Sequence, residues 1–240
     1  PAYLQSRIAE FYERAGKVVC HGKDGREGAV TIIGAVSPPG GDLSEPVTQA
    51  TQRIVKVFWG LDYALSYARH FPAINWLNSY TLYQTKMDEW MDTHIDPEFS
   101  ENRQLAMTLL QDEANLQEIV RLVGRDSLSE VDQLKLEAAK SIREDFLQQN
   151  AFHDVDTFCS YEKQNKMLKV VMDFYRHGKR ALEANVYLSE IEALPVREKI
   201  ARVKFIPEEE IQQIDEIHQE LLDSIEELIS VGGVVDAEGV

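Results

Sequence analysis

Residues 29–36 are Ala-Val-Thr-Ile-Ile-Gly-Ala-Val, and the positions of both alternations are apolar or β-branched. A strand that is apolar on both faces is typical of a sheet covered on both sides. Residues 37–46 form a turn-rich loop. At the end of this loop, Ser44, Glu45 and Pro46 favour the start of a helix that carries apolar residues as far as Leu65. This order of strand, loop and helix predicts an α/β fold.

Upstream of this stretch, the apolar spacing predicts a helix over residues 4–15 that ends at Gly16, followed by a short strand over residues 17–20. The glycines and prolines concentrate in this first part of the chain. We therefore assign residues 1–76 to an α/β domain and expect the character of the chain to change after it.

Downstream, the patterning is helical throughout, which predicts a helical bundle over residues 77–230. Its N-cap signals are Ser129 ahead of Asp132 and Pro207 ahead of three glutamates. Residues 231–240 lack periodicity and are expected to form a flexible tail. The predicted helices are Tyr80–Met91, Glu101–Val123 closed by Gly124, Glu130–Gln148, Glu162–Glu183 and Glu208–Leu228.

The composition excludes several classes of function. The chain has 240 residues and a formal net charge of -16, from 25 Lys and Arg against 41 Asp and Glu, so it disfavours nucleic acid as a partner. No apolar run reaches the roughly 20 residues that span a bilayer, so direct membrane insertion is not expected. The two cysteines, Cys20 and Cys159, form no disulfide framework and favour a reducing compartment.

Motifs for catalysis are missing from these 240 residues. The Gly-Lys pairs at Gly16, Gly22 and Gly178 lack the spacing and the following Ser or Thr of a phosphate-binding P-loop. The six histidines lack the i, i+4 pairing of a helical metal site, so no metal site is expected. Cys159 is interpreted as a small buried hydrophobe rather than a nucleophile. We therefore expect no catalytic residue in this chain.

Three longer strings carry a resemblance to a known family. Residues 33–48 are IGAVSPPGGDLSEPVT, residues 69–76 are RHFPAINW, and residues 142–156 are IREDFLQQNAFHDVD. In order and approximate spacing they resemble the catalytic A subunit of V-type and A-type rotary ATPases, and the opening YLQSRIAEFYERAG at residues 3–16 fits as well. The similarity covers the chain apart from its tail. The missing starting Met leads us to expect that the chain begins inside a larger protein.

The resemblance implies the end of a P-loop-type nucleotide-binding α/β domain followed by an all-α bundle. ATP or ADP with Mg²⁺ would bind the complete subunit, whereas this portion would bind neither tightly and would be inactive alone. In the family, aromatics at the positions of Phe71 and Phe152 flank the adenine ring, as suits a flat apolar base. Gln148, Gln149 and Asn150 are weaker candidates, because their amides serve equally well as helix caps. From periodicity alone, both phenylalanines would be core residues.

The resemblance also suggests two surfaces that face the rotating central stalk. The first is the loop with Asp42, Ser44 and Glu45. The second is the turn with Asp126, Ser127 and Glu130, which corresponds in position to an acidic helix-turn-helix of F-type catalytic subunits. The alternative for the second surface is a solvated turn with an ordinary helix cap.

The implied function is the coupling of ATP hydrolysis or synthesis to proton or sodium transport. The implied partners are the B subunit of the ATPase head and the central stalk subunits, in a cytoplasmic, peripheral part of a membrane complex. A different class remains open, namely a free-standing helical interaction module of ATPase ancestry without a nucleotide site. The non-catalytic B subunit is disfavoured, because the strings at residues 38–42 and 71–76 resemble the A type.

Overall fold

The computed structural model describes residues 3–235, and side chains as far as Val231. These residues form two compact units. The first, called here the N-terminal unit, holds residues 3–59 and 79–83. The second, called here the helical unit, holds residues 60–78 and 84–235. No helix among the described residues has both the length and the apolar content needed to cross a bilayer.

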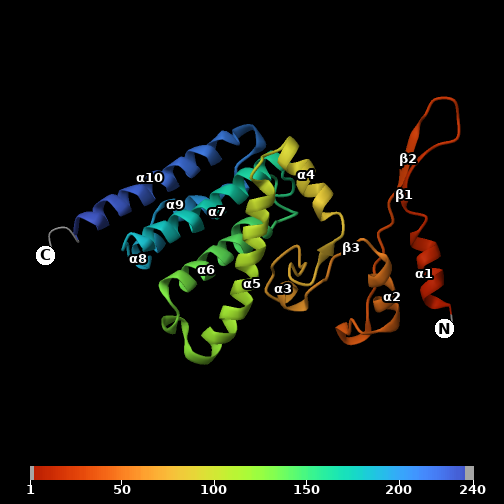
Figure 1. The fold of residues 1–240 in the computed structure, drawn as a ribbon, viewed down its shortest axis with the longest axis horizontal. Coiled ribbons are helices and arrows are strands. Elements are labelled where there is room, and N and C mark those ends of the chain that lie inside the picture. The colour runs from red at the N-terminus through yellow and green to blue at the C-terminus, as the bar shows by residue number, and fades with distance from the viewer. Residues whose placement is uncertain (1–2, 236–240) are drawn as a thin grey trace. The chain divides into compact units, whose positions relative to one another are not determined.

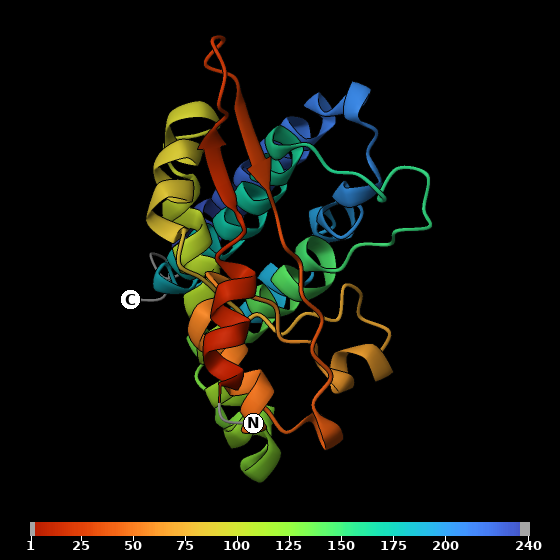
Figure 2. The ribbon, with the colours of Figure 1, turned by 90° about the vertical axis from the view of Figure 1, so that its right-hand side faces the viewer.

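The N-terminal unit pairs two helices with two small antiparallel sheets. Strands β1 and β2 form a hairpin in which Gly16 faces Val30 and Val19 faces Glu27, and Figure 2 shows the two strands side by side. Helix α1 packs against α2, and Tyr80 of β4 donates its hydroxyl to the carbonyl of Gln52 at 2.7 Å. The elements are α1 (Leu4–Tyr12), β1 (Gly16–Val19), β2 (Glu27–Val30), η1 (Pro39–Gly41), α2 (Pro46–Ile54), β3 (Val57–Phe58) and β4 (Tyr80–Thr81).

The buried strand predicted over residues 29–36 is wrong. Strand β2 ends at Val30, and Val30 and Ile33 are 57% and 83% exposed. A strand that is apolar on both faces is buried only where further strands and a covering layer surround it. Within residues 3–235, β1 is the one strand that pairs with β2. Residues 29–36 therefore have neither the further strands nor the covering layer that would bury them.

The helix predicted from Ser44 to Leu65 is too long. Helix α2 begins at Pro46 and ends at Ile54, because Val55 turns into extended backbone and Val57 pairs with Thr81 in the sheet of β3 and β4. Its N-cap is Glu45 rather than Ser44. The Glu45 carboxylate accepts the backbone N–H of Thr48 at 2.9 Å, with Pro46 at the first helical position.

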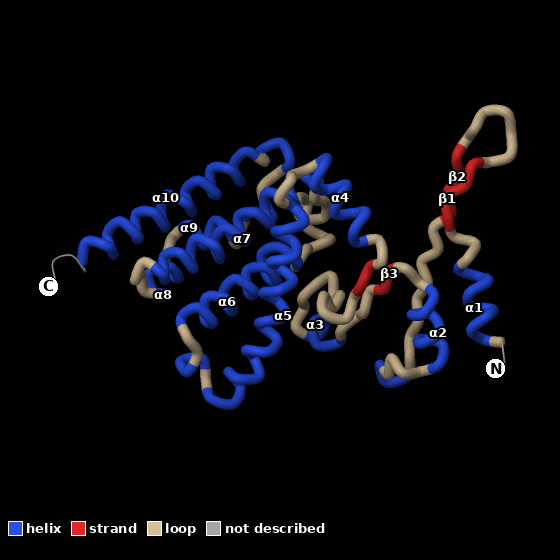
Figure 3. The backbone as a smooth tube through the Cα atoms, viewed as in Figure 1, coloured by secondary structure: helices blue, strands red, loops and turns tan. Residues whose placement is uncertain are grey.

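The helical unit is built around α7, which packs on α5, α6 and α10 (Figure 1). Figure 3 shows that helices make up most of this unit. The fully buried side chains include Leu134, Leu168, Met172, Leu221 and Ile225. Its elements are α3 (Tyr63–Tyr67), α4 (Gln84–His94), α5 (Phe99–Val123), η2 (Arg125–Ser127), α6 (Glu130–Ser141), a π-helix (Ile142–Leu147), α7 (Tyr161–Glu183), α8 (Leu188–Glu192), α9 (Val196–Ile200), η4 (Val203–Phe205), η5 (Glu208–Glu210) and α10 (Gln212–Val235).

Helices α5 and α7 agree with the sequence predictions to within two residues at both ends, whereas α10 begins at Gln212, four residues later than predicted. Helix α5 ends before Gly124, whose φ of 88° suits glycine, and α6 begins after Ser129, whose hydroxyl accepts the N–H of Asp132 at 3.2 Å. Helix α4 begins four residues later than predicted, at Gln84, because Tyr80 and Thr81 pair in β4. Helices α8 and α9 were not predicted, since five residues show too little periodicity.

The predicted tail is also corrected in part. Helix α10 continues to Val235, five residues into the stretch assigned to the tail. It runs through Gly232 and Gly233, because glycine lowers helix propensity without forbidding a helix. Residues 236–240 of the predicted tail lie outside the described residues.

Candidate nucleotide-base site

Two segments that are distant in sequence meet in the helical unit, and both carry predicted site residues. We call residues 69–72 the His-Phe segment and residues 148–153 the Gln-Phe segment. The backbone N–H of Gln149 donates to the carbonyl of Phe71 at 2.7 Å. His70 Nε2 lies 2.8 Å from the carbonyl oxygen of Arg143, in the π-helix that leads into the Gln-Phe segment. The structure therefore brings the chain around Phe71 to the start of the segment that carries Phe152.

The His-Phe segment is fixed by the loop that contains it. The Asp62 carboxylate caps α3 by accepting the N–H of Ala64 at 2.7 Å, and its other oxygen accepts the side-chain amide of Asn75 at 2.7 Å. The Asn75 hydrogen bond is the main reason that the pKa of Asp62 is lowered. A bridge between Leu61 and Ile74 closes the base of the same loop. The loop thus holds residues 69–72 in one place without a long helix or strand.

Both candidate phenylalanines lie at the surface of the helical unit. Phe71 is 50% exposed and Phe152 is 99% exposed. The alternative interpretation, that periodicity makes both of them core residues, is therefore wrong for this structure. An aromatic ring that has little protein packed on it offers a flat apolar face, which is what a purine base requires.

The three amide candidates differ in what they can offer a base. The Asn150 side-chain oxygen accepts the N–H of Phe152 at 3.0 Å, so Asn150 acts as a local turn cap. Gln149 contributes its backbone N–H to Phe71, as described above. The Gln148 side-chain amide lies 3.5 Å from the carbonyl of Arg69, a weak contact that leaves it the freest of the three to reach a ligand.

The Gln-Phe segment is held by residues that the sequence did not single out. Buried Asp156 accepts the N–H of Asn150 at 2.6 Å, which closes the turn around Phe152. His153 Nδ1 accepts the N–H of Val155 at 3.1 Å, and its ring packs 4.7 Å from the ring of Phe205. No short motif encodes these contacts. The only available signal was that Asn150, His153 and Asp156 flank Phe152 at intervals of three residues, a spacing typical of turns.

The first predicted stalk-facing group belongs to the N-terminal unit, and its members have local partners. Asp42 accepts the N–H of Ser44 at 2.8 Å, and hydrogen bonding from the Ser44 hydroxyl lowers the pKa of Asp42. Glu45 is the cap of α2, and hydrogen bonds from the backbone N–H groups of Val47 and Thr48 lower its pKa. These contacts explain the loop's shape without any partner.

The second predicted stalk-facing group belongs to the helical unit, at the turn between α5 and α6. Asp126 and Ser127 lie exposed in η2, and the Ser127 hydroxyl donates to the carbonyl of Gly124 at 2.7 Å. Glu130 is exposed in the first turn of α6. Neighbouring Arg125 pairs with Glu192 at 2.5 Å and with Glu137 at 3.1 Å, which ties the turn to the rest of the unit.

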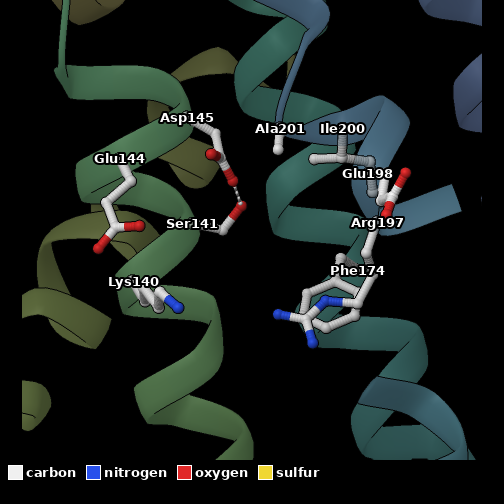
Figure 4. A pocket seen from close by; sticks show the side chains of 9 residues that line it. All are labelled: Lys140, Ser141, Glu144, Asp145, Phe174, Arg197, Glu198, Ile200 and Ala201. Atoms are coloured by element: carbon white, nitrogen blue, oxygen red, sulfur yellow. Dashed lines mark hydrogen bonds between the residues drawn. The ribbon is translucent and has the colours of Figure 1, made fainter. Parts of the chain in front are cut away.

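A separate cavity of about 250 Å³ opens between the end of α6, the π-helix, α7 and α9 (Figure 4). Inside it, the Ser141 hydroxyl donates to the Asp145 carboxylate at 2.5 Å, and burial raises the pKa of Asp145. The guanidinium of Arg197 lies over the ring of Phe174 at 5.1 Å. The lining includes none of the predicted site residues, so this cavity is distinct from the candidate base site.

Two further kinds of site are a metal centre and a nucleophilic thiol. Among residues 3–235 there is no group of three or more His, Cys, Asp or Glu side chains that could hold a metal ion. Cys159 is half-buried in the loop before α7, not in a helix, and burial raises the pKa of its thiol to about 11. A thiol with so high a pKa is almost entirely protonated at neutral pH and is a poor nucleophile.

Comparisons with known proteins identify two family domains in this chain. The profile of the ATP synthase alpha/beta family, nucleotide-binding domain, matches residues 1–81, and that of the C-terminal domain of V and A type ATP synthase matches residues 88–192. The class of protein is therefore an ATP synthase subunit of the alpha/beta type, with the end of a nucleotide-binding domain followed by a helical domain, as predicted. The proposed domain boundary between residues 76 and 77 stays a prediction. The division into compact units differs from it, since residues 60–78 belong to the helical unit.

Three relatives show which kind of ATP synthase subunit this chain resembles. V-type ATP synthase alpha chain 1 of Clostridium tetani is 67% identical over 237 residues, and the V-type ATP synthase alpha chains of Clostridium botulinum and Clostridium novyi are each 66% identical over 237 and 238 residues. Each match covers 99% of this chain and 40% of the relative. The chain belongs to the family of V-type ATP synthase alpha chains, which confirms the resemblance, and it spans about 40% of their length.

A solved structure shares the fold. It is described as a unique ATP synthase subunit NeqB from Nanoarcheaum equitans, with a TM-score of 0.59 and 22% sequence identity. The match covers 73% of this chain and 40% of that one. At this identity the likeness concerns the fold alone.

Proposed function

We propose that this chain acts as the C-terminal portion of the catalytic subunit of a V/A-type ATPase, where it contributes to the pocket for the adenine ring. The complete enzyme would couple ATP hydrolysis or synthesis to proton or sodium transport, with ATP or ADP bound together with Mg²⁺. We assign no residue of this chain to Mg²⁺ or to the chemical step. Its contribution is to bind and orient the base.

The observation that supports this proposal is the hydrogen bond between Gln149 and Phe71, which joins the two segments that carry Phe71 and Phe152. The two phenylalanines are 50% and 99% exposed, so their rings are available to a ligand. Stacking between an aromatic side chain and a base contributes about 1–3 kcal/mol per base. Aromatic faces also bind a purine without regard to phosphate charge, so this site would fix the base while other residues bind the phosphates.

The test is the substitution Phe152→Ala in the complete ATPase head. We expect its affinity for ADP to weaken by about 1–3 kcal/mol, because one stacking face is lost. Titration calorimetry measures the affinity, and an unchanged circular dichroism spectrum shows that the fold is intact. The matched control is Phe158→Ala, which removes a 65% exposed phenylalanine from the same loop and should leave the affinity unchanged. Equal affinities for Phe152→Ala and the unmodified enzyme would rule out the adenine contact.

We also propose that the partners of this portion are the B subunit of the ATPase head and the central stalk subunits, in a cytoplasmic, peripheral part of the membrane complex. The exposed turn with Asp126, Ser127 and Glu130 is our candidate for contact with the stalk. This assignment is supported by the ion pairs of Arg125 with Glu137 of α6 and Glu192 of α8. Through them, a displacement of the turn would be transmitted to the helical bundle. The loop with Asp42, Ser44 and Glu45 is the second candidate surface.

A further inference from the structure

We infer that Glu113, Arg143 and His70 are positioning residues that hold the His-Phe segment in place for base binding and connect it to helix α5. This inference rests on the proposed adenine contact. None of the three residues is among the candidate ligand contacts. Glu113 of α5 pairs with Arg143 of the π-helix, and the backbone of Arg143 contacts His70 of the His-Phe segment.

The first link is an ion pair between α5 and the π-helix. Arg143 Nε lies 3.0 Å from Glu113 Oε2, and Arg143 Nη2 lies 3.0 Å from Glu113 Oε1. This is a two-pronged contact between a guanidinium and a carboxylate, the geometry that fixes the orientation of both groups. Glu113 is 7% exposed, so its carboxylate is shielded from water and would be costly to leave without the Arg143 guanidinium. The ion pair therefore fixes the π-helix relative to the middle of α5.

The second link is the backbone carbonyl of Arg143, which has two partners. It accepts the N–H of Gln148 at 3.0 Å, which closes the end of the π-helix, and it lies 2.8 Å from Nε2 of His70. A carbonyl oxygen only accepts, so His70 Nε2 carries the proton and donates it. One oxygen atom thus joins the start of the Gln-Phe segment to the residue beside Phe71.

The third link is the burial of His70. It is 8% exposed, and its ring lies with its edge toward Trp76, at 5.7 Å between ring centres. Its Nδ1 atom is buried and has no hydrogen-bond partner. Burial and the hydrogen bond together fix the orientation of the His70 ring. His70 therefore holds the backbone that leads into Phe71.

The ion pair between Glu113 and Arg143 also connects the base site to the far end of α5. Glu113 lies in the middle of α5, and α5 ends at Val123, next to the turn with Asp126. A rigid helix therefore connects the candidate stalk-facing turn to the ion pair, and the ion pair connects to the His-Phe segment. Movement of α5 would change where Phe71 is presented. The structure thus offers a physical connection between the two surfaces that the proposed function requires.

The test compares His70→Phe, His70→Gln and Arg143→Met in the complete ATPase head. His70→Phe keeps a ring and loses the donor, whereas His70→Gln can place an N–H where Nε2 was. We expect the KM for ATP to rise about fivefold in His70→Phe and Arg143→Met, the size of one lost hydrogen bond, with the inhibition constant of tripolyphosphate, which carries no base, changed much less. His70→Gln should restore most of the ATP value. Weaker binding of ATP with unchanged binding of tripolyphosphate separates positioning of the base from a general loss of stability.

The matched control is Arg176→Met. Arg176 is 31% exposed against 26% for Arg143, and it also bridges to α5, through Glu101, but it has no contact with the His-Phe segment. It removes an ion pair to α5 and should leave the KM for ATP and the inhibition constant of tripolyphosphate unchanged. If His70→Phe keeps the unmodified KM for ATP, or if Arg176→Met raises that KM equally, the positioning role is wrong.

A second readout does not depend on nucleotide binding. Hydrogen exchange at the Gln149 amide reports the bond between that N–H and the Phe71 carbonyl. It should become about tenfold faster in His70→Phe and Arg143→Met, and stay unchanged in Arg176→Met. Unchanged exchange in the first two variants would overturn the inference. Faster exchange together with normal affinity in Phe152→Ala would instead leave the positioning role standing and reject the adenine contact.

Discussion

At the scale of single residues, Cys159 gives the most direct test of the electrostatics. Burial raises the pKa of its thiol to about 11, and only the thiolate reacts with alkylating reagents. At pH 8 about one Cys159 thiol in a thousand is ionised. We expect iodoacetamide to modify Cys159 slowly at pH 7, and the rate to rise about tenfold for each pH unit up to pH 9. Peptide mass spectrometry of the folded chain measures the rate at each pH.

The control for this experiment is the same reaction in urea, where Cys159 loses its protein surroundings and should react at the rate of a free cysteine. Cys20, in the N-terminal unit, serves as an internal comparison within each sample. Fast labelling of Cys159 at pH 7 in the folded chain would show that its thiol is activated, and it would contradict the interpretation of Cys159 as a small buried hydrophobe.

At the scale of elements, the turn between α5 and α6 depends on Gly124. Its φ of 88° and ψ of 160° fall in a region that is essentially restricted to glycine. We expect Gly124→Ala to lower the free energy of unfolding by about 1–3 kcal/mol, because the added methyl group strains the backbone rather than meeting a neighbouring atom. Urea unfolding followed by circular dichroism measures this change. Gln117→Ala, on the exposed face of α5, should stay within about 0.5 kcal/mol of the unmodified chain, and an equal loss in both variants would exclude backbone strain.

The elements also show what the sequence could and could not predict. Helices α5 and α7 have 25 and 23 residues, long enough for their apolar spacing and caps to mark them. The strand expected over residues 29–36 was wrong because burial depends on neighbouring strands, which a local pattern does not report. Phe71 and Phe152 were proposed as base contacts from the family resemblance, and that role stays a prediction. The contact between His70 and Arg143 was missed because it joins residues 73 positions apart through a backbone oxygen, which no side-chain pattern encodes.

At the scale of the whole molecule, the two units differ sharply in their cores. The main hydrophobic cluster is drawn from the helical unit, whereas the hairpin of the N-terminal unit exposes Val18 and Val19 by 61% and 67%. Segments with few buried apolar contacts open at low free-energy cost, and proteolysis follows such local opening. We therefore expect trypsin to cut the isolated chain first at Lys23 and Arg26 in the hairpin loop, long before it cuts at Lys169 in α7. Mass spectrometry of a digestion time course identifies the sites. Cleavage in α7 at the rate seen in the hairpin would mean that the bundle has no independent stability in the isolated chain.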